Sequence, residues 1–376
     1  MSAPDRFEVV EPARAFGELG PAWEELLCSS AADSPFLTPA WLEAWWGAYG
    51  AGREPLLVFA RRGEAIVGIF PLQVAAERWR GRLPLRTLRL FGDGTHDSDY
   101  LDFIVARGEE DLVLPAFWAW LRRAGSSLRY EVAQWNEIPE ASPAGAVVRK
   151  LAERDGSLLE EHRVGCVVTA LPPSYEGYVA SLKPRMRTKV RSLRRVLSDQ
   201  HGARFERADE ATLDATLDSL FRLHERRWTL RGESGVFAAP EKRAFYHAMG
   251  RALLTRGWLD LTTLVADGAP VAHQCCIRYR GTAFLLQEGY DPDWEDRGVG
   301  NALRAMTIEA MIGDGLHTYD FLAGVTSHKL SWGGTVKESL RLTLRGNGAR
   351  AAIASGLSLL SAARARLRAA FSRSAR

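Results

Sequence analysis

Apolar and polar residues alternate along the chain in a way that predicts a mixture of strands and helices. Short apolar runs closed by glycine, proline or aspartate predict a strand pair at 56–60 and 65–72. A second hairpin is predicted within 261–279, with Asp267-Gly268 at its tip. Helical patterns precede and separate these hairpins. The pattern as a whole predicts an α/β protein with mixed (α+β) sheets.

The two predicted hairpins share a local pattern. In each, an apolar strand turns through a polar loop into a valine followed by a small residue, at Val67-Gly68 and at Val271-Ala272. This similarity predicts two copies of one α/β unit, a tandem arrangement. We expect a first domain at 1–165, a second at 166–345 and a basic tail at 346–376.

The stretch 283–334 is predicted to form a strand, a glycine loop, a helix and a second strand. The first strand ends at Asp291-Pro292, and an apolar stripe at i, i+4, i+7 and i+11 starts at Val299. A glycine turn that leads from a strand into a helix directs backbone N–H groups and the helix dipole at one point. The pattern therefore predicts a phosphate-binding site at this turn.

A strongly basic helix is predicted after Ser181, with His201-Gly202 as its stop. Its apolar stripe is Met186, Val190, Leu193 and Leu197, and seven cations occupy other positions without an intervening acid. We expect this helix to bind an anionic acceptor or donor, through three substrate-binding residues: Lys183, Arg185 and Lys189. The alternative is a solvated helix face.

Composition and charge narrow the class of protein. The formal net charge of +3 over 376 residues is too small to indicate a nucleic-acid partner, and no apolar run is long enough for a membrane span. Residues 1–10 lack the apolar segment of a signal peptide, so a cytoplasmic protein is expected. The four cysteines have no zinc-type spacing. The acid-free tail predicts a frayed amphipathic helix or, alternatively, peripheral contact with an anionic membrane or RNA.

The glycine loop resembles the pyrophosphate loop of the GCN5-related (GNAT) acyl-CoA transferases. The run from Arg297 to Ala302 fits the pattern Arg/Gln-x-x-Gly-x-Gly/Ala. The resemblance implies an acyl-CoA co-substrate held by six residues: Arg297, Gly298, Val299, Gly300, Asn301 and Ala302. A plain β–α turn is the alternative. Nearby carboxylates argue against a pyrophosphate unless they point to solvent: Asp291, Asp293, Glu295 and Asp296.

A wider set of motifs, in order along 20–345, resembles the CelD/BcsL-type acetyltransferases, a GNAT branch associated with cellulose and exopolysaccharide biosynthesis. The motifs are Trp41-x-x-x-Trp45-Trp46, Asp99-Tyr100-Leu101-Asp102, Ser181-x-Lys183-x-Arg185, Leu223-His224-x-x-Arg227-Trp228, Gly235-Val236-Phe237, Tyr319-Asp320-Phe321 and Lys329-x-x-Trp332-Gly333. The resemblance implies tandem GNAT-like folds, with the acyl donor in the second half. It adds Arg227, Trp228 and Lys329 as substrate-binding positions.

A GNAT-like transfer needs a base, because the acceptor ammonium must lose a proton before it attacks the thioester. Glu288 is the first choice, since it shares a strand face with apolar residues and burial raises the pKa of a carboxylate. An arginine-paired structural glutamate is the alternative. His224 is the second candidate base, with a satisfied structural histidine as its alternative.

Two further residues complete the expected chemistry. Tyr319 is a candidate to protonate the leaving thiolate, or else a packing residue, and Asp320 a candidate to orient the amine or hold Lys329. No metal is required.

Three classes of function remain open. The first is an acetyl-CoA- or other acyl-CoA-dependent N-acyltransferase acting on an amino sugar or related amine. The second resembles the FemABX enzymes, which share the double fold and take amino acids from aminoacyl-tRNA. The third is a non-catalytic scaffold for polysaccharide synthesis. The loop at 297–302 favours the first.

Overall fold

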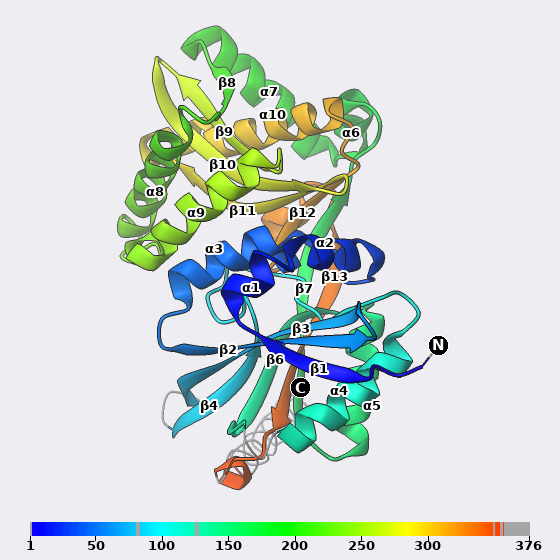
Figure 1. The fold of residues 1–376 in the computed structure, drawn as a ribbon. Coiled ribbons are helices and arrows are strands. Elements are labelled where there is room, and N and C mark those ends of the chain that lie inside the picture. Colours follow the sequence, from blue (N-terminus) through cyan, green and yellow to red (C-terminus); the bar gives the residue numbers. More distant parts are fainter. Residues whose placement is uncertain (1, 80–82, 125–127, 349, 354–355, 357–376) are drawn as a thin grey trace, which may run out of the picture. The chain divides into compact units, whose positions relative to one another are not determined.

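The computed structural model describes residues 2–79, 83–124, 128–348, 350–353 and 356. The chain forms two compact units (Figure 1). Unit 1 comprises Met1–Glu43, Gly50–Val164 and Glu338–Arg376, and unit 2 comprises Ala44–Tyr49 and Gly165–Lys337. Most of the basic tail expected at 346–376 lies outside the described residues. Within the described part of the chain, no helix is both long and apolar enough to cross a membrane.

The sheet of unit 1 begins with four antiparallel strands and continues with one parallel and one antiparallel partner. The strands follow the spatial order β1 (Arg6–Val10), β2 (Arg53–Arg62), β3 (Ala65–Trp79), β4 (Leu83–Leu90), β6 (Val132–Pro139) and β13 (Thr335–Arg345). The short β5 (Ile104–Val105) pairs with β3. β6 is parallel to β4, and β13 runs antiparallel to β6 from Ser339 onward.

The following helical segments belong wholly or partly to unit 1: α1 (Pro12–Phe16), α2 (Gly20–Ser29), η1 (Pro35–Leu37), α3 (Pro39–Tyr49), α4 (Glu110–Ala124) and α5 (Pro143–Arg154). Aromatic side chains dominate the unit's core. The rings of Phe70 on β3 and Phe117 on α4 stack with centroids 3.6 Å apart, and Trp23 and Trp41 are fully buried. These tryptophans are therefore packing residues.

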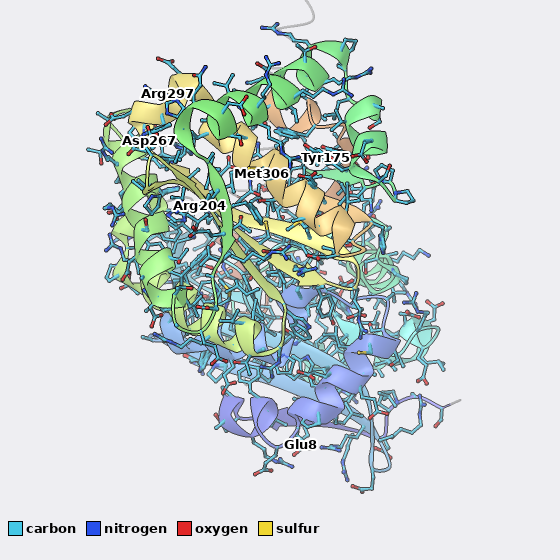
Figure 2. The ribbon with its side chains drawn as sticks, turned by 90° about the horizontal axis from the view of Figure 1, so that it is seen from above. Glu8, Tyr175, Arg204, Asp267, Arg297 and Met306 are labelled. Carbon is cyan, nitrogen blue, oxygen red and sulfur yellow. The ribbon has the colours of Figure 1, made fainter. Side chains whose placement is uncertain are left out.

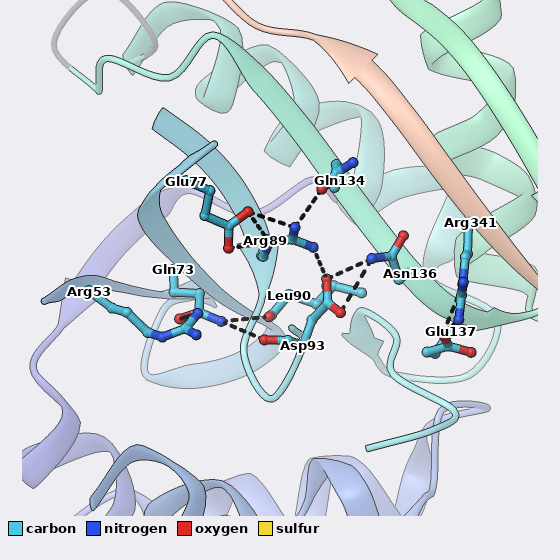
Figure 3. A network of polar contacts seen from close by, with 10 residues as sticks. All are labelled: Arg53, Gln73, Glu77, Arg89, Leu90, Asp93, Gln134, Asn136, Glu137 and Arg341. Atoms are coloured by element: carbon cyan, nitrogen blue, oxygen red, sulfur yellow. Dashed lines mark hydrogen bonds and ion pairs between the residues drawn. The ribbon is translucent and has the colours of Figure 1, made fainter. Parts of the chain in front are cut away.

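A polar network crosses the strands of unit 1 (Figure 3). Arg89 on β4 lies directly between Gln73 on β3 and Gln134 on β6 in the strand register. Its guanidinium donates to Glu77 at 2.7 Å and to Asp93 at 2.8 Å. Burial disfavours the charged arginine, but these two carboxylates outweigh that effect and raise the pKa of Arg89. The charge of Arg89 is thus balanced by Glu77 and Asp93, because polar groups in a largely buried sheet face need partners.

The sheet of unit 2 repeats the arrangement of unit 1. Its strands follow the order β8 (Arg204–Arg207), β9 (Leu259–Ala266), β10 (Ala269–Tyr279), β11 (Thr282–Tyr290), β12 (Thr318–Ala323) and β7 (Leu158–Ala170). The first four are antiparallel, β12 is parallel to β11, and β7 is antiparallel to β12. The hairpin predicted around Asp267-Gly268 is the β9–β10 turn.

The helices of unit 2 cover both faces of its sheet. They are α6 (Tyr175–Ser181), α7 (Pro184–His201), α8 (Leu213–Thr229), η2 (Val236–Ala238), α9 (Pro240–Thr255), η3 (Pro292–Arg297), α10 (Val299–Gly313) and α11 (Ser327–Leu330). Paired side chains show which helix lies on which face. Thr262 contacts Thr307 of α10 at 3.2 Å, whereas the ring of His273 contacts Ser219 of α8 at 2.8 Å. His273 pairs with Thr263, the neighbour of Thr262 on β9, and neighbouring residues of a strand point to opposite faces, so α10 and α8 lie on opposite faces of the sheet.

The shared strand order confirms the predicted tandem arrangement. In each unit, four antiparallel strands lead through a helix to a parallel strand, and an antiparallel strand completes the sheet. The strand that completes each sheet does not follow the order of the chain. β13 completes unit 1 although it follows unit 2 in the sequence, and β7 reaches unit 2 directly from unit 1.

Candidate functional site

A cavity of about 520 Å³ lies in unit 2 at the N-terminus of α10. Its lining comes from α7, α8, β11, η3, α10 and α11, which are far apart in the sequence. The residues are Lys189, Arg227, Arg231, Glu288, Tyr290, Glu295, Gly298, Val299, Gly300, Asn301, Arg304 and His328. The fold thus brings together the predicted glycine loop, the first candidate base and one residue of the basic helix.

The first turn of α10 presents free backbone donors to this cavity. Gly298 is its N-cap, with φ of +66°, and no side chain caps the helix. The N–H groups of Val299 and Gly300 have no intrahelical partner, as at any helix start. A Cβ added to Gly300 would lie 3.2 Å from the Tyr290 ring. Glycine at 298 therefore permits the turn, and glycine at 300 keeps the approach to the N–H groups open.

Two arginines, Arg226 on α8 and Arg231 just after it, neutralise most of the carboxylates beside the glycine loop. Arg226 donates to Asp291 and Asp293, each at 2.7 Å. Arg231 lies 3.4 Å from Glu295, which also accepts from the Tyr290 hydroxyl at 2.9 Å. The repulsion of an anion by these acids is therefore much smaller than the sequence alone indicates.

Two of the six expected loop residues do not line the cavity. Arg297 donates to the backbone oxygen of Asp293 at 3.2 Å, and its guanidinium lies 4.7 Å from the centre of the Trp294 ring. Figure 2 shows Arg297 on the exterior of the unit, on η3. Ala302 is buried in the apolar cluster below α10. Its small side chain serves the packing of helix on sheet.

Glu288 forms a partly buried ion pair with Arg304. Arg304 on α10 donates through Nη2 to Oε2 of Glu288, and its guanidinium lies 5.4 Å from the Phe321 ring and 5.3 Å from the Trp332 ring. Burial disfavours the Glu288 carboxylate, but Arg304 outweighs that effect, so the pKa of Glu288 lies below its ordinary value. This differs from the expectation of a raised pKa and favours the alternative of an arginine-paired glutamate.

His328 on α11 is the histidine of this cavity. Its Nε2 lies 3.0 Å from Oδ1 of Asn301 and 3.3 Å from Nη1 of Arg304. Burial and the adjacent Arg304 charge lower the pKa of His328, so its ring is neutral near pH 7. A guanidinium can only donate, so in the contact with Arg304 the Nε2 lone pair accepts, and the proton of the neutral ring is on Nδ1.

His224, the second candidate base, does not line the cavity. Its Nε2 accepts a hydrogen bond from the Trp228 indole at 3.0 Å, so its basic lone pair is occupied. Burial, followed by the nearby Arg227 and Lys242 charges, lowers the pKa of His224 to about 4. This geometry favours the structural alternative, and it gives Trp228 a partner within its own helix.

Three other expected residues have structural partners. The Tyr319 hydroxyl is buried and donates to Oε1 of Gln274 at 3.1 Å. Asp320 accepts from the N–H of Leu322 at 2.7 Å, where the backbone turns with φ of +58°. The Lys329 ammonium donates to the backbone oxygens of Phe321, at 2.8 Å, and Ala323, at 2.6 Å. Lys329 thereby fixes the end of β12.

The cations of α7 have different surroundings. Lys189 lines the cavity, whereas Lys183 and Arg185 are exposed and do not line it. Arg187 donates to the backbone oxygens of Ala180 and Leu182 just before the helix. A second cavity of about 450 Å³ is bordered by Arg191, Arg194 and Arg195 together with Tyr175, which Figure 2 places beside α10. The basic helix is therefore not one continuous binding surface.

Arg304 and His328 were missed by the sequence reasoning. Arg304 adjoins the apolar stripe of α10, and a charged residue at a buried helix position requires a partner. The position of Arg304 in the sequence therefore indicated a buried ion pair or hydrogen bond. His328 carries no comparable signal, since it lies on the four-residue helix α11 and reaches the cavity only through the turn after β12.

Part of the chain matches a known protein family. Residues 184–330 match a family described as acetyltransferase (GNAT) domain. No curated protein matches the chain at significant similarity. The matched segment runs from the start of α7 to the end of α11 and contains every residue of the cavity.

Solved structures share the fold at low sequence identity. The chain superposes on FemX with a TM-score of 0.63 and 10% identity, covering 90% of this chain and 96% of that chain. A tandem GNAT protein from the clavulanic acid biosynthesis pathway gives 0.51 and 14%, covering 92% and 99%. L-PGS from Bacillus licheniformis gives 0.50 and 11%, covering 86% and 96%. At these identities the likeness concerns the fold. With a GNAT-type acetyltransferase domain at 184–330 within a tandem GNAT fold, the protein is a transferase.

Proposed function

We propose that unit 2 binds an acyl-CoA, with acetyl-CoA as the simplest case, and transfers the acyl group to an amine. The observation that carries this proposal is the uncapped N-terminus of α10, which opens into the 520 Å³ cavity. Free N–H groups and the positive end of a helix dipole suit a pyrophosphate. Gly298, Val299, Gly300 and Asn301 would hold it.

The charges around the cavity support a polyanionic donor. Four cationic and two acidic side chains line it, and one acid, Glu288, is already paired with Arg304. Lys189 and Arg227 would contact the phosphates. The Nε of Arg227 is buried and has no partner among the described residues. A buried, unmade donor of this kind favours an anionic ligand that could satisfy part of the guanidinium.

The acceptor we propose is an amino sugar or a related metabolite with a primary amine. The Glu288 side chain is 30% exposed and lines the cavity, where its carboxylate would contact the acceptor amine. An acceptor from exopolysaccharide or envelope biosynthesis, as in the CelD-type proteins, is the specific form of this proposal. The contact of the 346–376 tail with a membrane surface stays a prediction.

Titration calorimetry with acetyl-CoA, followed by mass spectrometry of an amine panel, tests the proposal. We expect a dissociation constant in the micromolar range and an acetylated amine product. Dependence on aminoacyl-tRNA with no response to acetyl-CoA would support the FemABX-like alternative instead. A protein that binds neither donor and yet retains polysaccharide synthesis in cells would support the scaffold alternative.

A further inference from the structure

We propose that unit 2 carries a second binding site, which takes an apolar α-amino acid as its free zwitterion. The site is the cavity of about 450 Å³ bordered by α6, α7 and α10. Among the described residues, it shares none of its lining with the cavity at the start of α10. The inference therefore goes beyond the proposed acyl transfer and does not depend on it.

The two cavities lie on different faces of α7. Successive residues of an α-helix are rotated by about 100° around its axis. Lys189, which lines the cavity at the start of α10, is therefore roughly 160° from Arg191. Arg195 and Ser198, which border the second cavity, lie within about 40° of Arg191. A ligand in the second cavity is thus separate from the proposed acyl donor.

The charged side chains of the second cavity have both signs, and most of them are unpaired. Arg194 contacts Glu309 of α10 at 2.5 Å, so these two charges cancel. Four other charged side chains border the cavity, are exposed, and form no ion pair or hydrogen bond with any described side chain: Arg191, Arg195, Glu176 and Asp199. A ligand with one sign of charge would be repelled by two of these four groups. A zwitterion can satisfy both signs.

The spacing of the charges along α7 suits an α-amino acid. Arg195 and Asp199 are four residues apart, so they are neighbours on one helix face, about 6 Å apart along the axis. The carboxylate and ammonium groups of an α-amino acid flank a single carbon atom. A guanidinium can hold the carboxylate through two parallel N–H donors, and Asp199 can accept from the ammonium. Arg191, one turn before Arg195, supplies a second guanidinium for the carboxylate.

The rest of the lining suits an apolar side chain. Val179 of α6 and Val190 of α7 are buried and line the cavity. Tyr175 adds an aromatic ring, and its hydroxyl is buried without a hydrogen-bond partner among the described residues. Burial raises the pKa of Tyr175 to about 12, so the hydroxyl keeps its proton near pH 7 and can donate to a ligand. The volume is sufficient for an amino acid the size of leucine or phenylalanine.

Calorimetry on the full chain tests the proposal with L-leucine, L-phenylalanine and two matched analogues of leucine. The analogue 4-methylpentanoate lacks the ammonium group, and 3-methylbutylamine lacks the carboxylate. We expect an amino acid to bind with a dissociation constant of about 0.1–1 mM, and both analogues to bind at least about tenfold more weakly. An analogue that binds as tightly as leucine would overturn the proposal. So would the failure of both amino acids to bind at about 10 mM.

Variants of α7 locate the ligand. Arg191→Gln combined with Arg195→Gln should weaken amino-acid binding at least about tenfold, and Asp199→Asn about three- to tenfold. Arg185→Gln is the control, since Arg185 is exposed on the same helix and does not line the cavity. Unchanged affinity in the double variant, or an equal loss in the control, would contradict the assignment.

The same titrations separate this site from the proposed function. The dissociation constant for acetyl-CoA should stay within about twofold of the wild-type value in the double variant, because its two arginines do not line the cavity at the start of α10. If the wild-type protein binds an amino acid through Arg191 and Arg195 but does not bind acetyl-CoA, the proposed function fails and the second site holds. The reverse result overturns the second site alone.

Discussion

Arg304 and Glu288 face each other across the α10–β11 interface, and both line the cavity, with Glu288 the more exposed of the two. The side chain of Arg304 is 3% exposed, whereas that of Glu288 is 30% exposed. Arg304 also approaches His328 through its other terminal nitrogen, at 3.3 Å. One buried cation therefore controls the protonation of both the carboxylate and the histidine, and it keeps one charged and the other neutral.

Removing Arg304 should destabilise unit 2 more than removing the pair. Arg304→Met leaves the Glu288 carboxylate without its counter-charge, and we expect the free energy of unfolding to fall by about 2–3 kcal/mol. This is less than the 3–5 kcal/mol typical of a fully buried pair, because Glu288 is partly solvated. Urea denaturation measures the change. The double variant with Glu288→Met should recover part of it, and equal losses in both would contradict the pairing argument.

Gly300→Glu should raise the dissociation constant for acetyl-CoA at least tenfold. The new side chain would cover the free N–H groups of α10 and place a negative charge where the pyrophosphate is expected. Gly313→Glu, at the exposed C-terminal end of the same helix, is the matched control, since a Cβ there meets no atom within 4 Å. Calorimetry on both folded variants compares them. Similar affinities of the two variants for acetyl-CoA would contradict the assignment of the glycine loop as the pyrophosphate site.

Reversal of charge should separate Lys189 from Arg185, which lie one helical turn apart on α7. Lys189→Glu should raise KM for acetyl-CoA about tenfold at low salt, because Lys189 lines the cavity. Arg185→Glu should leave KM unchanged within twofold. The Lys189 effect should shrink as the Debye length falls from about 10 Å at 0.1 M salt to about 3 Å at 1 M. Equal effects of the two reversals would point to a diffuse field of the whole helix.

Two buried histidines should make the protein sensitive to mild acid. Burial, with nearby cations, lowers the pKa of His224 and of His273 to about 4. The unfolded chain binds protons near pH 6.5, before the folded chain does. The free energy of unfolding should therefore fall as the pH drops from 6.5 to 4, by up to about 3 kcal/mol for each histidine.

The variant His224→Gln isolates one of these contributions. Its amide oxygen can still accept from the Trp228 indole, but the side chain no longer titrates. The slope of stability against pH between 6.5 and 4 should become shallower, as measured by urea denaturation at several pH values. His162→Gln is the control, because the His162 side chain is 67% exposed. A slope unchanged in His224→Gln would show that other groups dominate.

Local patterns predicted the elements around the site well. The sequence 283–322 gives β11, α10 and β12 in order, because strand and helix periodicities are strong there. The basic helix ends at His201 as expected, since Gly202 adopts φ of +55° and closes it. Tandem organisation could also be inferred, from two short hairpins and from the resemblance to a known family.

Partners distant in the sequence could not be predicted in the same way. Spacing does not reveal that Arg304 would pair with Glu288, that Arg297 would turn toward Trp294, or that the Lys329 ammonium would bind backbone oxygens. These outcomes depend on tertiary packing. The role of His224 depends on packing as well, because its occupied lone pair is visible only once the Trp228 indole is placed.

The order in which the strands are completed has a consequence for synthesis on the ribosome. Unit 1 gains β13 only after Gly165–Lys337 has been translated, so the edge of β6 lacks this partner in the meantime. At about 5–20 residues per second, that interval is roughly nine to thirty-five seconds. An unpaired edge strand is a template for association with other chains. A nascent chain stalled within unit 2 is therefore a natural substrate for chaperones that bind exposed strands.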